Sequence, residues 1–109
     1  MTKIQVVELI ANSLTGIDRC LSDPNLPPDS AEWHQLYALR KALDDQQREL
    51  VTSMFQEDDA DFVGISDKIQ ALNKELVSTL TEIQKIASTI AIVTKVIGAV
   101  GQLLSLVHP

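Results

Sequence analysis

The sequence predicts an all-α protein, a long helical hairpin or helical bundle with one C-terminal helix of about 45 residues. Three observations predict it. Apolar residues recur at alternate spacings of three and four, the period of an amphipathic helix. A proline-rich segment and an acidic segment divide that pattern into three parts. Aromatic residues make up only 4% of the chain, so the core must be aliphatic. The length of 109 residues predicts a single domain.

The first helix is expected over residues 3–20. Thr2 and Gln5 have the spacing of a capping box, in which each side chain bonds the backbone N–H of the other residue. The residues after Thr2 form one apolar stripe at helical spacing, which comprises Ile4, Val7, Ile10, Ala11, Leu14, Ile17 and Leu21.

A proline-rich break at residues 22–28 separates the first helix from a second one over residues 30–55. Its three prolines remove backbone donors and push the residues before them out of the helical region. Asp29 with Glu32 then gives a helix-start signal. Arg40 and Gln47 interrupt the apolar stripe, so this helix is expected to be half buried at most. The stripe comprises Trp33, Leu36, Leu43, Leu50 and Met54, widened by Tyr37 and Val51.

An acidic turn at residues 56–61 precedes the third helix, expected over residues 62–107. Its heptad seam is apolar at every position except Thr79, which favours one continuous helix in a single register. The seam comprises Phe62, Ile65, Ile69, Leu72, Leu76, Thr79, Ile83, Ile86, Ile90, Val93, Ile97, Val100, Leu104 and Val107. The opposite line is polar throughout and comprises Asp67, Lys74, Thr81, Ser88, Lys95 and Gln102.

The last third of this helix, residues 86–107, needs a cover that the rest of the chain does not supply. A second helix folded back through the acidic turn ends opposite about residue 85. The first helix then either continues end-on over residues 86–107 or folds back beside the second helix. Either arrangement leaves apolar surface exposed, which predicts a partner. A second copy or another helical protein would fit. The expected interface comprises Ile83, Ile86, Ile90, Val93, Ile97, Val100 and Leu104.

Composition argues against several classes of function. The net charge of −6 argues against nucleic acid, whose binders need clustered Lys and Arg. Cys20 is the only cysteine, so no intrachain disulfide or cysteine-based zinc site is possible. The N-terminal segment contains Glu8 and lacks the unbroken apolar core of a signal peptide, which predicts a cytoplasmic location. The chain is therefore expected to be a non-catalytic, self-associating interaction module, with a homodimer as its simplest form.

The sequence contains no complete metal-binding or cofactor-binding motif. Read as a calcium loop from Asp59, the sequence has Gln70 where a bidentate Glu is needed. Neither His34 nor His108 has a Glu three residues before it, as di-iron bundles require. No cofactor, metal or catalytic residue is predicted. An all-α enzyme or metal protein that uses the acidic turn is the least favoured alternative.

A membrane-active or membrane-anchored protein is the stronger alternative. Residues 86–107 are long enough to span a hydrocarbon core of about 30 Å. Lys95 opposes insertion, at a cost of about 3 kcal/mol near the helix centre, and it lies on the polar line of the heptad. A long helical hairpin with one apolar segment resembles, in outline only and without a shared motif, the α-helical pore-forming cytolysins.

Overall fold

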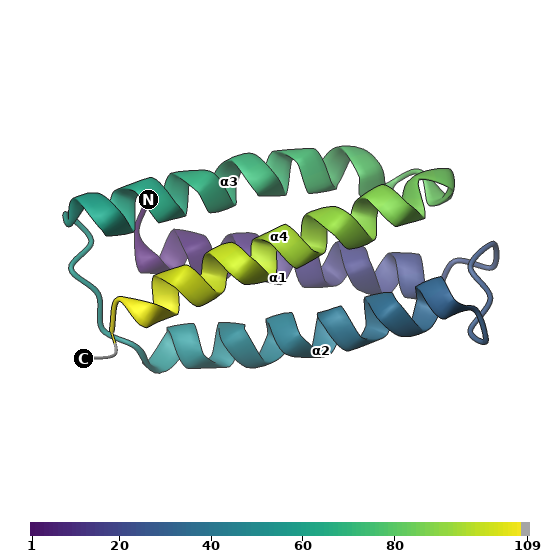
Figure 1. Cartoon of the computed structure of the whole chain (residues 1–109), viewed down its shortest axis with the longest axis horizontal. Coiled ribbons are helices and arrows are strands. Elements are labelled where there is room, and N and C mark those ends of the chain that lie inside the picture. The colour runs from purple at the N-terminus through teal and green to yellow at the C-terminus, as the bar shows by residue number, and fades with distance from the viewer. Residues whose placement is uncertain (108–109) are drawn as a thin grey trace.

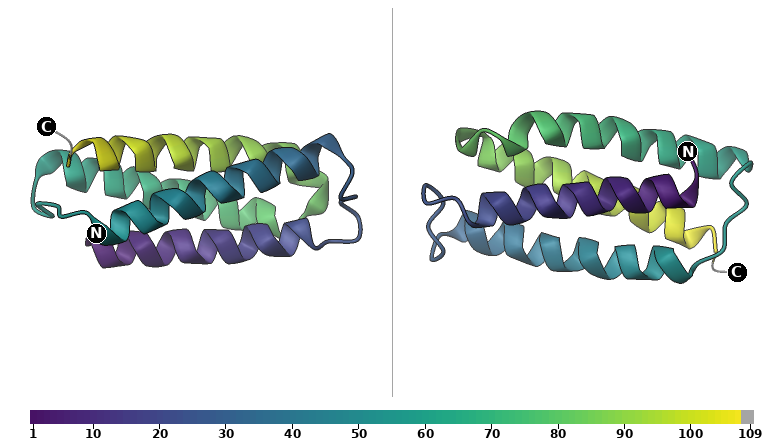
Figure 2. Two further views of the ribbon diagram at one scale, coloured as in Figure 1. Left: turned by 90° about the horizontal axis from the view of Figure 1, so that it is seen from below. Right: turned by 180° about the vertical axis from the view of Figure 1, so that it is seen from behind.

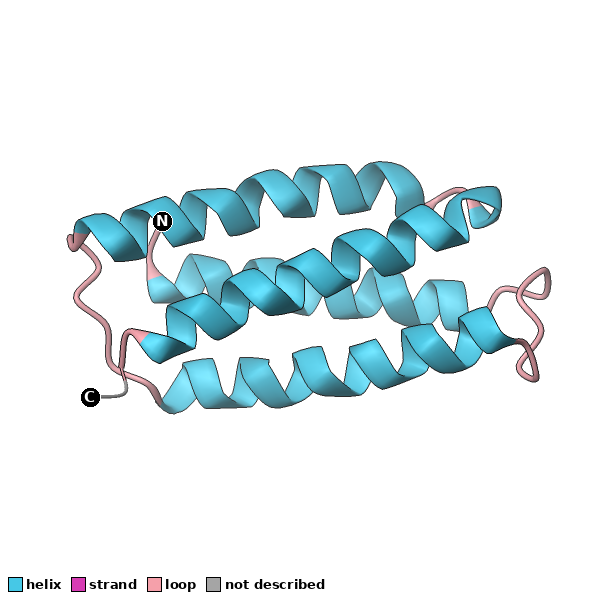
Figure 3. Ribbon diagram, in the orientation of Figure 1, coloured by secondary structure: helices cyan, strands magenta, loops and turns pink. Residues whose placement is uncertain are grey.

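The computed structural model describes residues 1–107, so His108 lies outside the described residues. The described residues form four α-helices: α1 (Lys3–Leu21), α2 (Ala31–Thr52), α3 (Ala60–Leu80) and α4 (Ile86–Ser105). A short 3₁₀ turn, η1 (Ile83–Lys85), precedes α4. No strand occurs among residues 1–107, and loops connect the helices, with η1 inside the connection from α3 to α4 (Figure 3). The prediction of an all-α protein is confirmed.

The four helices form a bundle of two helical hairpins, 43 × 22 × 17 Å in extent (Figure 1). α1 packs on α2 and α3, and α4 packs on α2 and α3. The connection from α2 to α3, residues 53–59, therefore crosses the end of the bundle between diagonal helices (Figure 2). α1 folds back beside α2, as in one of the two arrangements left open. The protruding C-terminal end that belonged to that arrangement is not seen, because α4 packs on α2 and α3.

Three of the four helices begin at a side-chain cap. Thr2 and Gln5 form the predicted capping box at α1. At α2 the cap is Ser30, one residue after the expected Asp29, and the Ser30 hydroxyl accepts from the Trp33 N–H at 3.2 Å. At α3 the Asp59 carboxylate accepts from the Asp61 N–H at 2.8 Å. Each cap satisfies a backbone donor that the first helical turn leaves unpaired.

The expected single helix over residues 62–107 is wrong. α3 ends at Leu80, and the chain reverses so that α4 runs back along α3. Burial explains the difference, because a straight helix of that length would leave the apolar residues after Lys85 without cover inside one chain. Folding back places α4 against α2 as well as α3 and buries Val93, Val96 and Val100. The heptad register carried no information about this reversal.

The core is aliphatic apart from the buried Phe62, close to what the composition predicted, and it extends along the whole bundle. Leu36, Leu43 and Leu50, one heptad apart, form the completely buried line of α2. The expected stripe of α2 is wrong at its C-terminal end, because Met54 is 85% exposed. Met54 lies beyond Thr52, where α2 ends, so the helical spacing no longer directs it inward.

Polar side chains of α2 bond both neighbouring helices. Gln47 Nε2 donates to the Val7 carbonyl of α1 at 3.1 Å, and Gln46 Nε2 donates to the Ile97 carbonyl of α4 at 3.0 Å. Arg40 Nε donates to Asp18 Oδ1 of α1 at 3.0 Å. The two residues that interrupted the apolar stripe, Arg40 and Gln47, therefore hold α2 against α1.

Lys3 fastens α1 to the far end of α2. Its Nζ donates to the carbonyls of Val51 and Ser53, at 3.1 and 2.9 Å. These carbonyls lie at the C-terminal end of α2, where a positive charge is favourable. The Glu57 carboxylate accepts from the backbone N–H of Lys3. The start of α1 and the α2–α3 connection are thus held together.

Candidate functional site

The seven residues of the expected interface lie at three levels of burial. Val93 and Val100 are completely buried inside the single chain, and Leu104 is nearly so. Ile86, Ile90 and Ile97 are partly buried at the edge of the core. Ile83 is half-buried in η1. Only the second and third groups retain surface that a partner could contact.

The buried face of α4 is rotated from the predicted seam by less than the 100° of one residue, since Val93, Val100 and Leu104 belong to both. Thr89, Val96 and Leu103 lie in the core, whereas Ile90 and Ile97 lie at its edge. The rotation follows from the fold, because α4 contacts both α2 and α3 and presents the face between them. The heptad of a straight helix had assumed a seam continuous with that of α3.

The outward face of α4 carries a line of small side chains. The line, named here the small-residue face, comprises Ala87, Ala91, Thr94 and Gly98, all of them exposed. The Thr94 hydroxyl donates to the Ile90 carbonyl of its own helix at 2.8 Å. The hydroxyl proton of Thr94 therefore does not need a hydrogen bond to water. A Cβ added at Gly98 would meet no atom of another described element within 4 Å, so no other helix of residues 1–107 packs there. The small-residue face is therefore open along the helix.

Charge is distributed unevenly between α4 and the other helices. All fifteen acidic residues precede Ile83, and the only charged residues after it are Lys85 and Lys95. Ile83–Ser105, which joins η1 and α4, has a mean hydropathy of 1.6 and is long and apolar enough to cross a membrane by length and composition. Core helices of soluble bundles satisfy the same criterion. α4 is thus the least negative part of an acidic molecule.

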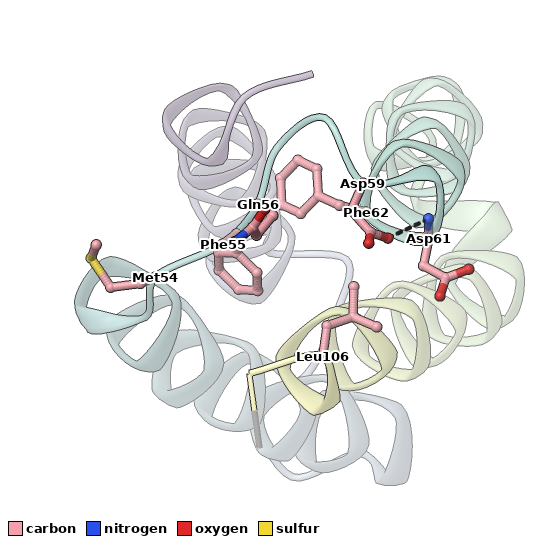
Figure 4. A pocket seen from close by; sticks show the side chains of 7 residues that line it. All are labelled: Met54, Phe55, Gln56, Asp59, Asp61, Phe62 and Leu106. Atoms are coloured by element: carbon pink, nitrogen blue, oxygen red, sulfur yellow. Dashed lines mark hydrogen bonds between the residues drawn. The ribbon is translucent and has the colours of Figure 1, made fainter. Parts of the chain in front are cut away.

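A recess opens at the end of the bundle where the α2–α3 connection meets the end of α4 (Figure 4). It measures about 300 Å³, and Phe55, Phe62 and Leu106 supply its apolar lining. The centroids of the Phe55 and Phe62 rings lie 5.3 Å apart, and the two ring planes are tilted by 48°. Asp59 and Asp61 stand at its edge, and the Asp59 carboxylate is occupied as the cap of α3. The acidic turn therefore starts a helix and forms the edge of this recess.

Two kinds of chemical site can be judged from the described side chains: a metal-ligand cluster and a nucleophilic thiol. Within residues 1–107, no three His, Cys, Asp or Glu side chains gather as they would around a metal ion. Burial raises the pKa of the Cys20 thiol, and the negative charge of Asp23 raises it further. The thiol lies 3.4 Å from the Leu80 carbonyl, to which it donates. A buried neutral thiol of this kind is a poor nucleophile.

Trp33 and Tyr37 stack at the start of α2, with ring centroids 5.1 Å apart and ring planes 9° from parallel. Trp33 Nε1 donates to the Leu21 carbonyl at the end of α1, at 2.9 Å. Trp33 therefore ties the two arms of the first hairpin together across the proline-rich break.

The small-residue face was not identified as a site from the sequence. Its signal was present in the alternation of Ala, Thr and Gly at helical spacing between the polar line and the isoleucines. Comparison with protein-family models, with curated proteins and with solved structures gives no match for this chain.

Proposed function

We propose that this chain is a non-catalytic helical module that self-associates through the small-residue face of α4, with a second copy as the partner. The observation that carries the proposal is an exposed, acid-free helix face of Ala87, Ala91, Thr94 and Gly98 on an otherwise acidic molecule. The half-buried Ile86, Ile90 and Ile97 border this face and add apolar contact area. Val93, Val100 and Leu104 support it from inside.

Side-chain size and charge both favour a second copy there. Small side chains let two helix backbones approach closely. The same face on both copies can meet across a two-fold axis, which is the commonest symmetry of soluble oligomers. Two molecules of net charge −6 repel each other, and the repulsion is weakest where neither presents a carboxylate. Lys95 lies beside the small-residue face, and its side chain is exposed to solvent.

The test is a comparison of Ala91→Glu with Ala42→Glu. Both alanines are exposed within helices, on α4 and α2 respectively, so the two variants change net charge and helix composition equally. Sedimentation without detergent is expected to show a wild-type mass that rises with concentration, an unchanged rise for Ala42→Glu, and a monomer for Ala91→Glu. Equal association of the two variants would show that the proposed face is not the contact.

Membrane association is the second candidate, because Ile83–Ser105 meets the length and hydropathy of a spanning helix. The same variants separate it from self-association. A membrane-active protein would float with vesicles of zwitterionic lipid, which do not repel a molecule of net charge −6, and would lose that property in Ala91→Glu. A protein that remains in the lipid-free fraction, while its mass rises with concentration, would exclude the membrane candidate.

A further inference from the structure

The junction between α3 and α4 lacks the signals that end and start the other helices. Residues 81–85 contain neither glycine nor proline. No side chain caps η1, whose N-cap is Glu82, and none caps α4, whose N-cap is Lys85. Lys85 also places a positive charge at the positive end of the α4 dipole. The local sequence therefore does not favour a break at this point.

The backbone departs from a helix at only a few positions of the junction. Thr81, with φ −87° and ψ −5°, is still in the right-handed helical region. Glu82, with φ −125° and ψ 102°, is extended. Lys85, with φ −96° and ψ 23°, lies just outside the helical region. No residue in the described chain has a positive φ, so rotation about few bonds would make residues 60–105 one helix.

The apolar seam continues across the junction. Leu76 and Thr79 of α3 are followed at the heptad spacing by Ile83, Ile86 and Ile90. The three isoleucines are only half-buried in the closed bundle. In a straight helix they would lie in line with the core residues of α3. The straight form thus has its own apolar seam, which a second chain could cover.

α3 is held to α1 at its C-terminal end, so a separation of α3 and α4 would take α4 out of its place between α2 and α3. A Cβ added at Gly16 of α1 would lie 2.5 Å from Leu80 Cδ1, which shows how closely Leu80 packs there. The Cys20 thiol donates to the Leu80 carbonyl. By contrast, Gln46 provides the only side-chain hydrogen bond to α4 from another helix in the described part of the chain.

We propose that α3 and α4 can join into one continuous helix, and that α4 then replaces its counterpart in a second copy to give an exchanged dimer. Every contact that α4 makes with α2 and α3 would form again between chains, and the junction would gain helical hydrogen bonds. Exchange of an identical element is a low-cost route to a dimer. The inference goes beyond the proposed function, because the small-residue face stays outside in the exchanged dimer.

An intrachain distance tests the proposal. Spin labels are placed at the exposed positions Asp67 and Gln102 in a Cys20→Ser chain, which is mixed with an excess of unlabelled chain. In the closed bundle the two positions lie on adjacent antiparallel helices whose axes are about 8–10 Å apart, so the labels should stay within roughly 25 Å. In the straight helix they lie 35 residues apart, or about 52 Å. An exchanged dimer is expected to show the long distance, whereas the monomer and a dimer of closed bundles joined through the small-residue face should show the short one.

Two junction variants supply the matched control. Ile83→Pro fits the closed form, because proline is tolerated at a first helical position and Glu82 before it is extended. It does not fit a helix interior. Ile83→Ala removes the same side chain and permits both forms. We expect the ratio of exchanged dimer to monomer to be at least about 100-fold lower for Ile83→Pro than for Ile83→Ala.

Three results would overturn the inference: a dimer with the short intrachain distance, equal exchange in the two junction variants, or a wild-type chain that stays monomeric at every concentration. A short-distance dimer that Ala91→Glu abolishes would support the proposed face alone. A long-distance dimer that Ala91→Glu leaves intact would support exchange alone. The two proposals can therefore fail separately.

Discussion

Substitution of the two glycines at 98 and 16 by alanine should change stability by different amounts. Gly98 lies inside α4 with no atom within 4 Å of an added Cβ. Gly98→Ala therefore adds helix propensity without a clash, and the free energy of unfolding should rise by about 0.5–1 kcal/mol. At Gly16 the added Cβ would lie 2.5 Å from Leu80 Cδ1. Overpacking costs about 1–3 kcal/mol, and the half-buried Leu80 side chain can shift to relieve part of it, so Gly16→Ala should be less stable than Gly98→Ala by about 1–3 kcal/mol at most.

Urea unfolding followed by circular dichroism at low protein concentration measures both effects on the monomer. For a slope of about 1–3 kcal/mol per molar urea, the midpoint for Gly98→Ala should increase by roughly 0.2–1 M. The double variant Gly16→Ala with Leu80→Ala should lose less stability than the sum of its single variants, because the clash is removed. A lower midpoint for Gly98→Ala would refute the reasoning, since it would mean that the outer face of α4 is packed in the monomer.

Three further predictions concern the core. Leu43→Ala should lower the free energy of unfolding by about 2–5 kcal/mol in urea melts, because Leu43 is completely buried, whereas exposed Met54→Ala should change it by less than about 0.5 kcal/mol. The Thr89 hydroxyl is buried without a hydrogen-bond partner among the described residues, so Thr89→Val should raise the free energy of unfolding by about 1 kcal/mol. The opposite replacement at another buried position of α4, Val93→Thr, should lower it by about 1–3 kcal/mol. Burial raises the pKa of the Cys20 thiol above its ordinary value of 9.0, so the unfolded thiol ionises first and stability should fall as the pH rises past that value. The fall between pH 8 and 10 should be smaller in Cys20→Ser; equal slopes would contradict this cause.

Local signals in the sequence predicted local structure well. The Thr2–Gln5 capping box forms as expected, and the proline-rich break separates α1 from α2. All six residues of the polar line that begins at Asp67 are exposed. Caps, proline and amphipathic spacing act within a few residues, so one sequence is enough to read them.

The features of the fold that the sequence did not predict depend on packing between residues that are far apart in the chain. The reversal at Glu82 has no local signal, and the heptad runs through it without a change of register. α4 turns back because α2 and α3 together bury more of its apolar surface than a straight helix could. The same packing rotates α4 so that Thr89 and Val96 enter the core in place of Ile90 and Ile97. The small-residue face became visible only once that rotation was known.

Self-association through α4 is the central claim, and the solution mass of the wild-type chain without detergent tests it most directly. Sedimentation at increasing concentrations should show the mass rise from 12.0 kDa toward twice that value. Ala91→Glu should lose the rise that depends on the small-residue face, so any mass above 12.0 kDa in that variant should belong to a dimer with the long intrachain distance. A wild-type mass that stays at 12.0 kDa at every concentration would contradict the claim.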